Sequence, residues 1–163
     1  MPGHSTHDTR KITGRRELHF ATLEDLRQDA EQLAGKETRV LGNWSQGQIY
    51  QHIAKALHLS IDGIDFRPPL WMRLLVPLVR SSMLRKTPKP GFQLPKTLEA
   101  KFLPDEHVTT EAGLADLIAA IERCQSTPDR ATHFLFGKLT TEETNQFQLR
   151  HAELHLSFIL PVE

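Results

Sequence analysis

Four segments of the chain have the pattern of capped amphipathic helices, and almost no segment alternates apolar and polar residues as a half-buried strand does. These segments cover about residues 23–34, 45–62, 109–127 and 140–160. The second and fourth begin with a capping box, formed by Ser45 with Gln48 and by Thr140 with Glu143. The one strand-like fragment, 133–136, is too short to build a sheet. The pattern predicts an all-α four-helix bundle.

The longest connection, residues 66–104, separates the second and third predicted helices and is rich in proline and basic residues. Residues 67–101 hold eight Lys or Arg residues and one acid, Glu99. We expect a short helix over 70–84 and, because its apolar content is large, we expect the segment to pack over the bundle near the histidines. Residues 70–80 also suit an interfacial membrane helix. Since Pro77 should interrupt that helix, we favour a cover or a dimer face.

Length and composition place limits on the class of protein. The 163 residues suggest one domain, over 15–163, preceded by a disordered tail over 1–14. The 20 basic and 20 acidic residues balance, which disfavours a general nucleic-acid binder. The single cysteine, Cys124, excludes an intrachain disulfide and a multi-cysteine zinc site. The chain has no apolar N-terminal leader and no run long enough for stable membrane insertion, so we expect a cytoplasmic protein.

The chain has nine histidines, and three of them fall on the apolar faces of two predicted helices. His151 and His155 are four residues apart, so both rings lie on one face of the last helix. His52 lies between Ile49 and Ala56 on the inward face of the second helix. The pattern predicts a three-histidine site for a divalent metal, with one position open to water or substrate. Imidazole suits zinc, nickel, iron and copper, and hydrogen-bonded core histidines are the alternative.

The two predicted helices that carry the candidate metal ligands offer no adjacent general base or nucleophile. The catalytic residues therefore stay unassigned. Glu153 and Ser157 each lie about 200° around the helix from the histidine two residues before, away from the ion. We therefore disfavour peptide hydrolysis of the His-Glu-x-x-His type. Cys124 is expected to be a small apolar residue rather than a nucleophile. The other histidines in the folded part are weaker candidates, since they are solvated or lie outside the apolar stripes: His19, His58, His107 and His133.

Two motifs resemble the DinB-like (YfiT-like) superfamily. One is Asn43-Trp44-Ser45 followed by His52, and the other is the His151/His155 pair in the last helix. The stretches 90–95, 136–140 and 150–158 resemble a branch known only as a domain of unknown function. The resemblance implies an up-down-down-up bundle, a homodimer, and a zinc or nickel site with ligands His52, His151 and His155. The chain departs from many members in the residues that follow His155, where it lacks a His-Arg-Gly-Gln-like run.

The same resemblance implies two classes of function. The superfamily includes transferases and isomerases that use the thiols mycothiol or bacillithiol, so one expectation is a metal-dependent thiol S-transferase or hydrolase. Its substrate would be a small thiol or an anion, which the basic segment 67–101 could hold; the alternative for this segment, which we favour slightly, is a solvated basic loop. The other expectation is a non-catalytic metal- or ligand-binding module involved in stress response.

Overall fold

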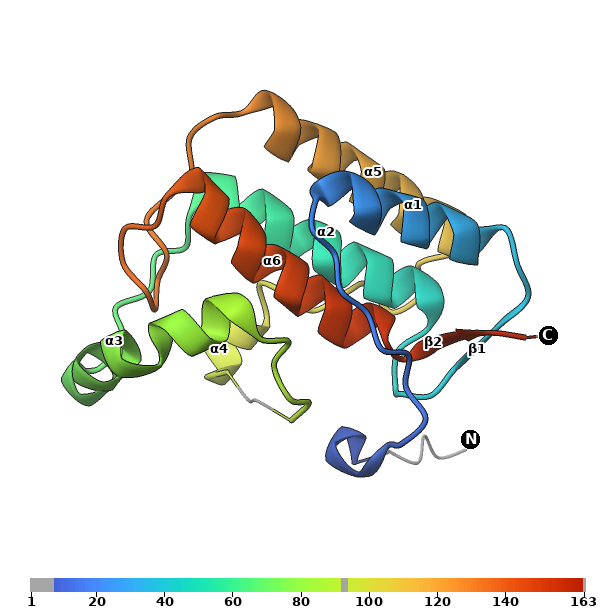
Figure 1. The fold of residues 1–163 in the computed structure, drawn as a ribbon, viewed down its shortest axis with the longest axis horizontal. Coiled ribbons are helices and arrows are strands. Elements are labelled where there is room, and N and C mark those ends of the chain that lie inside the picture. The colour runs from blue at the N-terminus through green and yellow to red at the C-terminus, as the bar shows by residue number, and fades with distance from the viewer. Residues whose placement is uncertain (1–7, 92–93, 163) are drawn as a thin grey trace.

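The chain is mostly helical in the computed structural model, which describes residues 8–91 and 94–162 (Figure 1). The first seven residues of the predicted tail lie outside the described residues, and Thr9–Lys11 of that tail forms a short 3-10 helix, η1. The remaining elements, in chain order, are α1 (Leu23–Ala34), β1 (Thr38–Val40), α2 (Gln46–Asp62), α3 (Leu70–Arg85), α4 (Lys96–Glu99), α5 (Thr110–Ser126), α6 (Thr141–Leu156) and β2 (Ile159–Pro161). Among the described residues, no helix is long and apolar enough to cross a membrane.

The predicted starts of α2 and α6 are confirmed. Both starts depend on hydrogen bonds between residues within one helical turn. The Ser45 hydroxyl accepts from the Gln48 N–H, and the Gln48 side chain accepts in turn from the Ser45 N–H. Thr140 and Glu143 form the same reciprocal pair at the start of α6. These bonds satisfy backbone donors that a helix leaves free at its first turn.

Helices α1, α2, α5 and α6 enclose the main apolar core, and α2 makes its most extensive contact with α5. Two glycines permit this close packing. A Cβ atom at Gly47 would overlap the backbone carbonyl of Thr109, and one at Gly113 would overlap that of Gly47. Between the helices, the buried Tyr50 hydroxyl donates to the Ala30 carbonyl at 2.9 Å. The packing fixes α2, which carries one of the three candidate ligands.

Two sequence predictions about the ends of helices are wrong. Helix α6 ends at Leu156 instead of continuing to about residue 160. The chain then forms β2, which pairs antiparallel with β1 and sets Val40 opposite Ile159. This pairing joins segments that are far apart in the sequence, so no local pattern revealed it. The predicted helix over 70–84 is confirmed as α3, but Pro77 does not interrupt it, and the helix continues through this proline to Arg85.

Among the described residues, the connection between α2 and α5 packs over the helices with the inner face of α3 and with its second half. Its later residues border a cavity beside the histidines, among them Met83, Leu94 and Phe102. The outer face of α3 is exposed instead, with Leu70 and Leu78 at 68% and 79% exposure. The expectation that the whole segment covers the bundle is therefore wrong for the outer face of residues 70–79, whereas Val76 on the inner face does pack. In Figure 1, α3 lies to one side of the main helices and contacts α6.

Candidate metal centre

Three histidine side chains converge at one point between α2 and α6. The Nε2 atoms of His52, His151 and His155 form a triangle in which each of the three separations is 3.1 Å. The i, i+4 spacing on α6 aligns the last two rings, and the packing of α2 brings His52 to them. The structure thus brings together all three residues that the sequence singled out.

The ring of His52 is held by the connection that precedes α5. Its Nδ1 lies 2.8 Å from the backbone carbonyl oxygen of Phe102. A carbonyl only accepts, so Nδ1 carries the proton and Nε2 presents its lone pair toward the other two histidines. This is the arrangement in which a second partner orients a metal-ligating imidazole.

An aromatic side chain also contacts the triad. The Trp44 ring stacks on His155 with centroids 5.6 Å apart, and lies 4.7 Å from the ring of His52. Trp44 comes just before the residue that caps α2, so the same local signal that starts this helix places the indole beside the histidines. The indole thus contacts two of the three candidate ligands directly.

Enclosure by protein keeps the three histidines neutral. Desolvation lowers the pKa of His52 to about 4 and that of His151 to about 3, and it holds the pKa of His155 well below its usual range. The proximity of the neighbouring histidines adds to the effect for the two residues of α6. A metal requires neutral imidazole, so protons do not compete for these nitrogens near neutral pH.

The separations fit a shared ion. Nitrogens bound to one zinc-like ion at about 2.0–2.1 Å are about 2.8–3.4 Å apart, from octahedral to tetrahedral geometry. The observed 3.1 Å lies within that range. The three side chains are therefore close enough to hold a metal ion.

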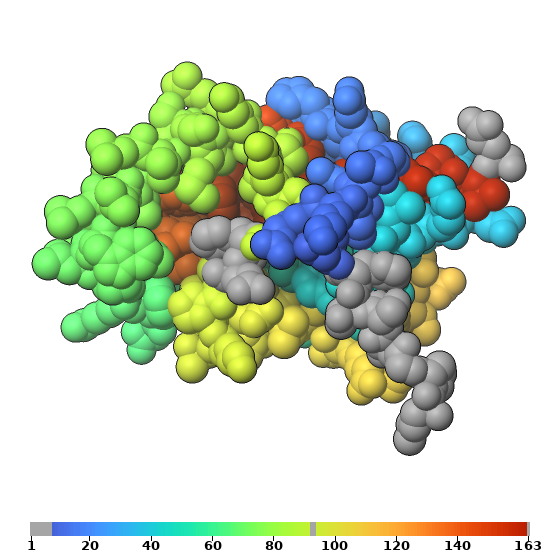
Figure 2. Space-filling view, turned by 90° about the horizontal axis from the view of Figure 1, so that it is seen from below, coloured from blue at the N-terminus to red at the C-terminus, as the bar shows by residue number. Residues whose placement is uncertain are grey.

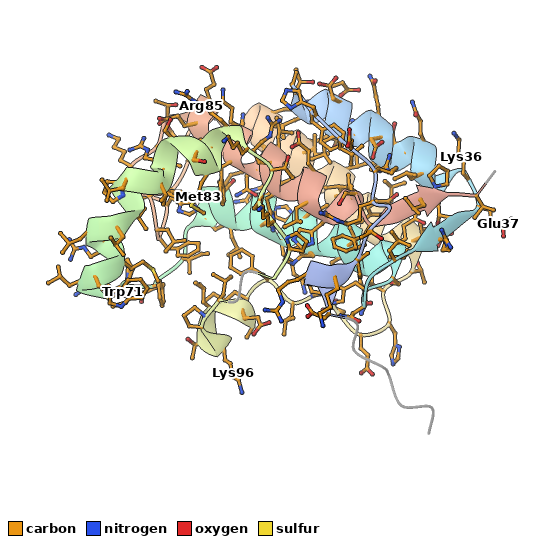
Figure 3. All side chains as sticks on the ribbon, turned by 60° about the horizontal axis from the view of Figure 1, so that its bottom comes forward. Lys36, Glu37, Trp71, Met83, Arg85 and Lys96 are labelled. Carbon is orange, nitrogen blue, oxygen red and sulfur yellow. The ribbon has the colours of Figure 1, made fainter. Side chains whose placement is uncertain are left out.

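A cavity of about 670 Å³ opens beside the triad. It is lined by the three histidines, by apolar residues from α2 and α6, and by the second half of the long connection. In Figure 2, α3 and the segment around α4 border a hollow on this face of the molecule. Figure 3 shows Met83 on the side of α3 that faces the helices. A small, largely apolar molecule would fit in this space next to the histidines.

Two polar side chains of the cavity were missed by the sequence analysis. His133 lies outside the helical stripes, so its place in the sequence does not indicate a site, yet it lines the cavity, and burial lowers its pKa to about 4. Its Nδ1 accepts from the N–H groups of Leu135 and Phe136, so the ring proton is on Nε2. Gln148 is buried on α6, and its amide makes no hydrogen bond with a described residue. Neither residue carried a local signal, since each depends on tertiary packing.

The residues that were predicted to face away from the site have partners elsewhere. The Glu153 carboxylate is fully buried and forms an ion pair with Arg150 at 2.7 Å. The Ser157 hydroxyl donates to the Leu154 carbonyl at 2.6 Å. Cys124 is buried, which raises the pKa of its thiol. None of the three lines the cavity.

Comparison with known proteins places the chain in a family without giving it an activity. Residues 12–162 match the family described as Protein of unknown function (DUF1569). The chain belongs to this family. No curated protein and no solved structure matches it. For this DUF1569 protein, the site geometry thus carries the functional argument.

Proposed function

We propose that this DUF1569 protein is a DinB-like bundle of up-down-down-up topology in which His52, His151 and His155 bind one divalent zinc or nickel ion. The observation that carries the proposal is the triangle of Nε2 atoms, 3.1 Å on each side. Three neutral ligands leave such an ion its full charge. When bound, the ion would act as a Lewis acid and lower the pKa of a thiol or water molecule that binds it.

We further propose that the protein is a metal-dependent thiol S-transferase. The thiol is a substrate, because the chain's own cysteine, Cys124, is buried away from the cavity. The thiol sulfur would form a bond to an electrophilic carbon of an apolar co-substrate. The leaving group would depart with the electron pair of its broken bond, and the thiol proton would pass to solvent. The apolar lining of the cavity suits the co-substrate, and Lys89 on its wall suits an anionic thiol.

His133 and Gln148 are the residues that would position the co-substrate. The Nε2–H of His133 can donate to a ligand in the cavity, because its Nδ1 is already used by two backbone N–H groups. The Gln148 amide has no described partner and lies one helical turn before His151. A ligand that bonds both would remove the cost of leaving these polar groups unpaired.

Cobalt substitution tests the transferase proposal directly. Addition of bacillithiol, mycothiol or glutathione to the cobalt-loaded protein should produce a thiolate-to-metal charge-transfer band in the near ultraviolet. The His151→Ala variant, loaded in the same way, should give no band. If no thiol changes the spectrum of the cobalt-loaded protein, the protein would instead be a non-catalytic metal- or ligand-binding module acting in stress response.

Two further expectations remain proposals. We propose that the protein is a homodimer and that it works in the cytoplasm. The first rests on its resemblance to DinB-like proteins, which are commonly dimeric. Sedimentation equilibrium of the untagged protein should give about twice the chain mass, and a single-chain mass would contradict the dimer.

A further inference from the structure

Helix α3 has two apolar faces, and among the described residues only one of them packs against the rest of the chain. Val76, Met83 and Leu84 on the inner face contact a small cluster that includes Phe136 and Phe147. The outer face carries two adjacent rows at i, i+4, i+8 spacing, which are exposed by between 46% and 79%: Leu70, Leu74 and Leu78, and Trp71, Leu75 and Val79. Six large apolar side chains on one exposed face form a contiguous patch, which marks an interaction surface.

Most basic residues of the stretch that contains α3 have no acidic partner among the described residues. Residues 67–98 contain no Asp or Glu. Arg80 pairs with Glu143 of α6 at 2.9 Å. Six other cations of this stretch are exposed and form no ion pair with a described residue: Arg67, Arg73, Arg85, Lys86, Lys89 and Lys96. The partner must therefore accept apolar side chains and supply negative charge.

We propose that α3 is an interfacial helix that docks this protein on an anionic lipid bilayer. An amphipathic helix with leucines and a tryptophan on one face and basic residues around it is typical of helices that lie in the headgroup plane. Trp71 suits this position because indole prefers the membrane interface. The 16 residues of α3 extend about 24 Å, and no described helix could span a bilayer, so the helix lies on the surface.

Charge argues against a second copy of the chain as the occupant. A two-fold dimer over α3 would bring the same exposed cations of both copies together. The segment has no acidic residue that could neutralise them. Anionic headgroups provide the opposite charge, and the acyl region accepts the leucines.

Docking through α3 would also place the cavity near the lipid. The inner face of the same helix contributes Met83 to the cavity wall. Figure 3 shows Met83 on the side toward the helices and Trp71 at the opposite, N-terminal end of α3. The docking itself does not depend on the metal or on the proposed reaction.

Flotation of the full chain with vesicles tests the proposal. We expect binding to vesicles of phosphatidylcholine with about 30% phosphatidylserine, little binding to phosphatidylcholine alone, and release at about 0.5 M salt. The double variant Leu74→Gln, Leu78→Gln should bind about tenfold more weakly or worse, because both side chains are exposed and lie at the centre of the patch. Val162→Gln, an exposed apolar residue elsewhere, is the matched control.

Charge variants and oligomeric state complete the test. Arg73→Gln with Lys86→Gln should weaken binding to anionic vesicles, whereas Lys36→Gln at the far end of the molecule should not (Figure 3). Circular dichroism of each variant checks that it is folded. If the wild-type chain binds neither the anionic nor the phosphatidylcholine vesicles, the proposal is wrong. So would a wild-type dimer in sedimentation velocity that the double variant Leu74→Gln, Leu78→Gln dissolves, since a second copy would then cover α3.

Discussion

The Nδ1–H of His52 donates to the carbonyl oxygen of Phe102 at 2.8 Å, and this bond joins a candidate metal ligand to the long connection before α5. The bond selects the tautomer in which Nε2 is free to bind an ion. The connection between α2 and α5 therefore also orients a candidate metal ligand. It sets the chemistry of the site and lines the cavity beside it.

Glu153 should prove to be a structural residue and not a catalytic one. Its carboxylate accepts from the Phe20 N–H at 2.7 Å and from the Thr87 hydroxyl at 2.5 Å, and it pairs with Arg150. Glu153→Ala would leave Arg150 buried without its counterion, which costs about 3–5 kcal/mol of unfolding free energy. Urea denaturation measures the loss, and Glu142→Ala on the exposed side of α6 is the control. A variant as stable as the wild type would contradict this role.

The metal-free protein should lose stability as the pH falls. Burial lowers the pKa of His133 to about 4 in the folded chain, against about 6.5 in an unfolded one. Between about pH 6.5 and pH 4, His133 binds a proton in the unfolded chain but stays neutral in the folded chain. The stability is therefore fully present above about pH 6.5 and is lost progressively toward pH 4, by about 3 kcal/mol for this one group.

His52 and His151, whose pKa values are also lowered, act in the same direction. In urea titrations at a series of pH values, His133→Gln should show a shallower decline than the wild type. His107→Gln, at an exposed position, should keep the full slope. An identical slope for His133→Gln and wild type would show that His133 does not carry the effect.

Gln148→Leu should weaken co-substrate binding and leave the metal in place. The change keeps the approximate size of the side chain but removes the amide, which has no described partner. The loss of one hydrogen bond to a neutral ligand corresponds to about 1 kcal/mol, or about fivefold in affinity. Titration calorimetry with the co-substrate measures this loss of affinity. Gln146→Leu on the exposed side of α6 is the matched control. Loss of metal from Gln148→Leu would point to a structural role.

The parts of the fold that depend on neighbouring residues could be predicted from the sequence. The capping pairs Ser45/Gln48 and Thr140/Glu143 fixed the starts of α2 and α6, because both partners lie within one turn. The inward positions of the three histidines also followed from helical spacing. Helical periodicity says which faces are buried, whereas the position of His52 beside the α6 pair depends on how α2 packs against α6.

The parts that depend on distant residues could not be predicted in this way. The pairing of Val40 with Ile159 brings together segments more than a hundred residues apart. The role of His133 depends on a turn that packs its ring between Phe134 and Phe136, with centroids 4.7 and 4.6 Å away. Apolar side chains are usually buried, so the sequence alone favoured packing of residues 70–79 over the bundle. The structure instead exposes the outer face of α3.

The central claim is that His52, His151 and His155 hold one divalent ion. Elemental analysis of the untagged protein, purified without a metal-affinity step, tests it most directly. We predict about one zinc or nickel ion for each chain in the wild type, close to none in folded His151→Ala, and an unchanged content in His58→Ala. A wild-type protein that stays without metal after dialysis against excess zinc and nickel would contradict the claim.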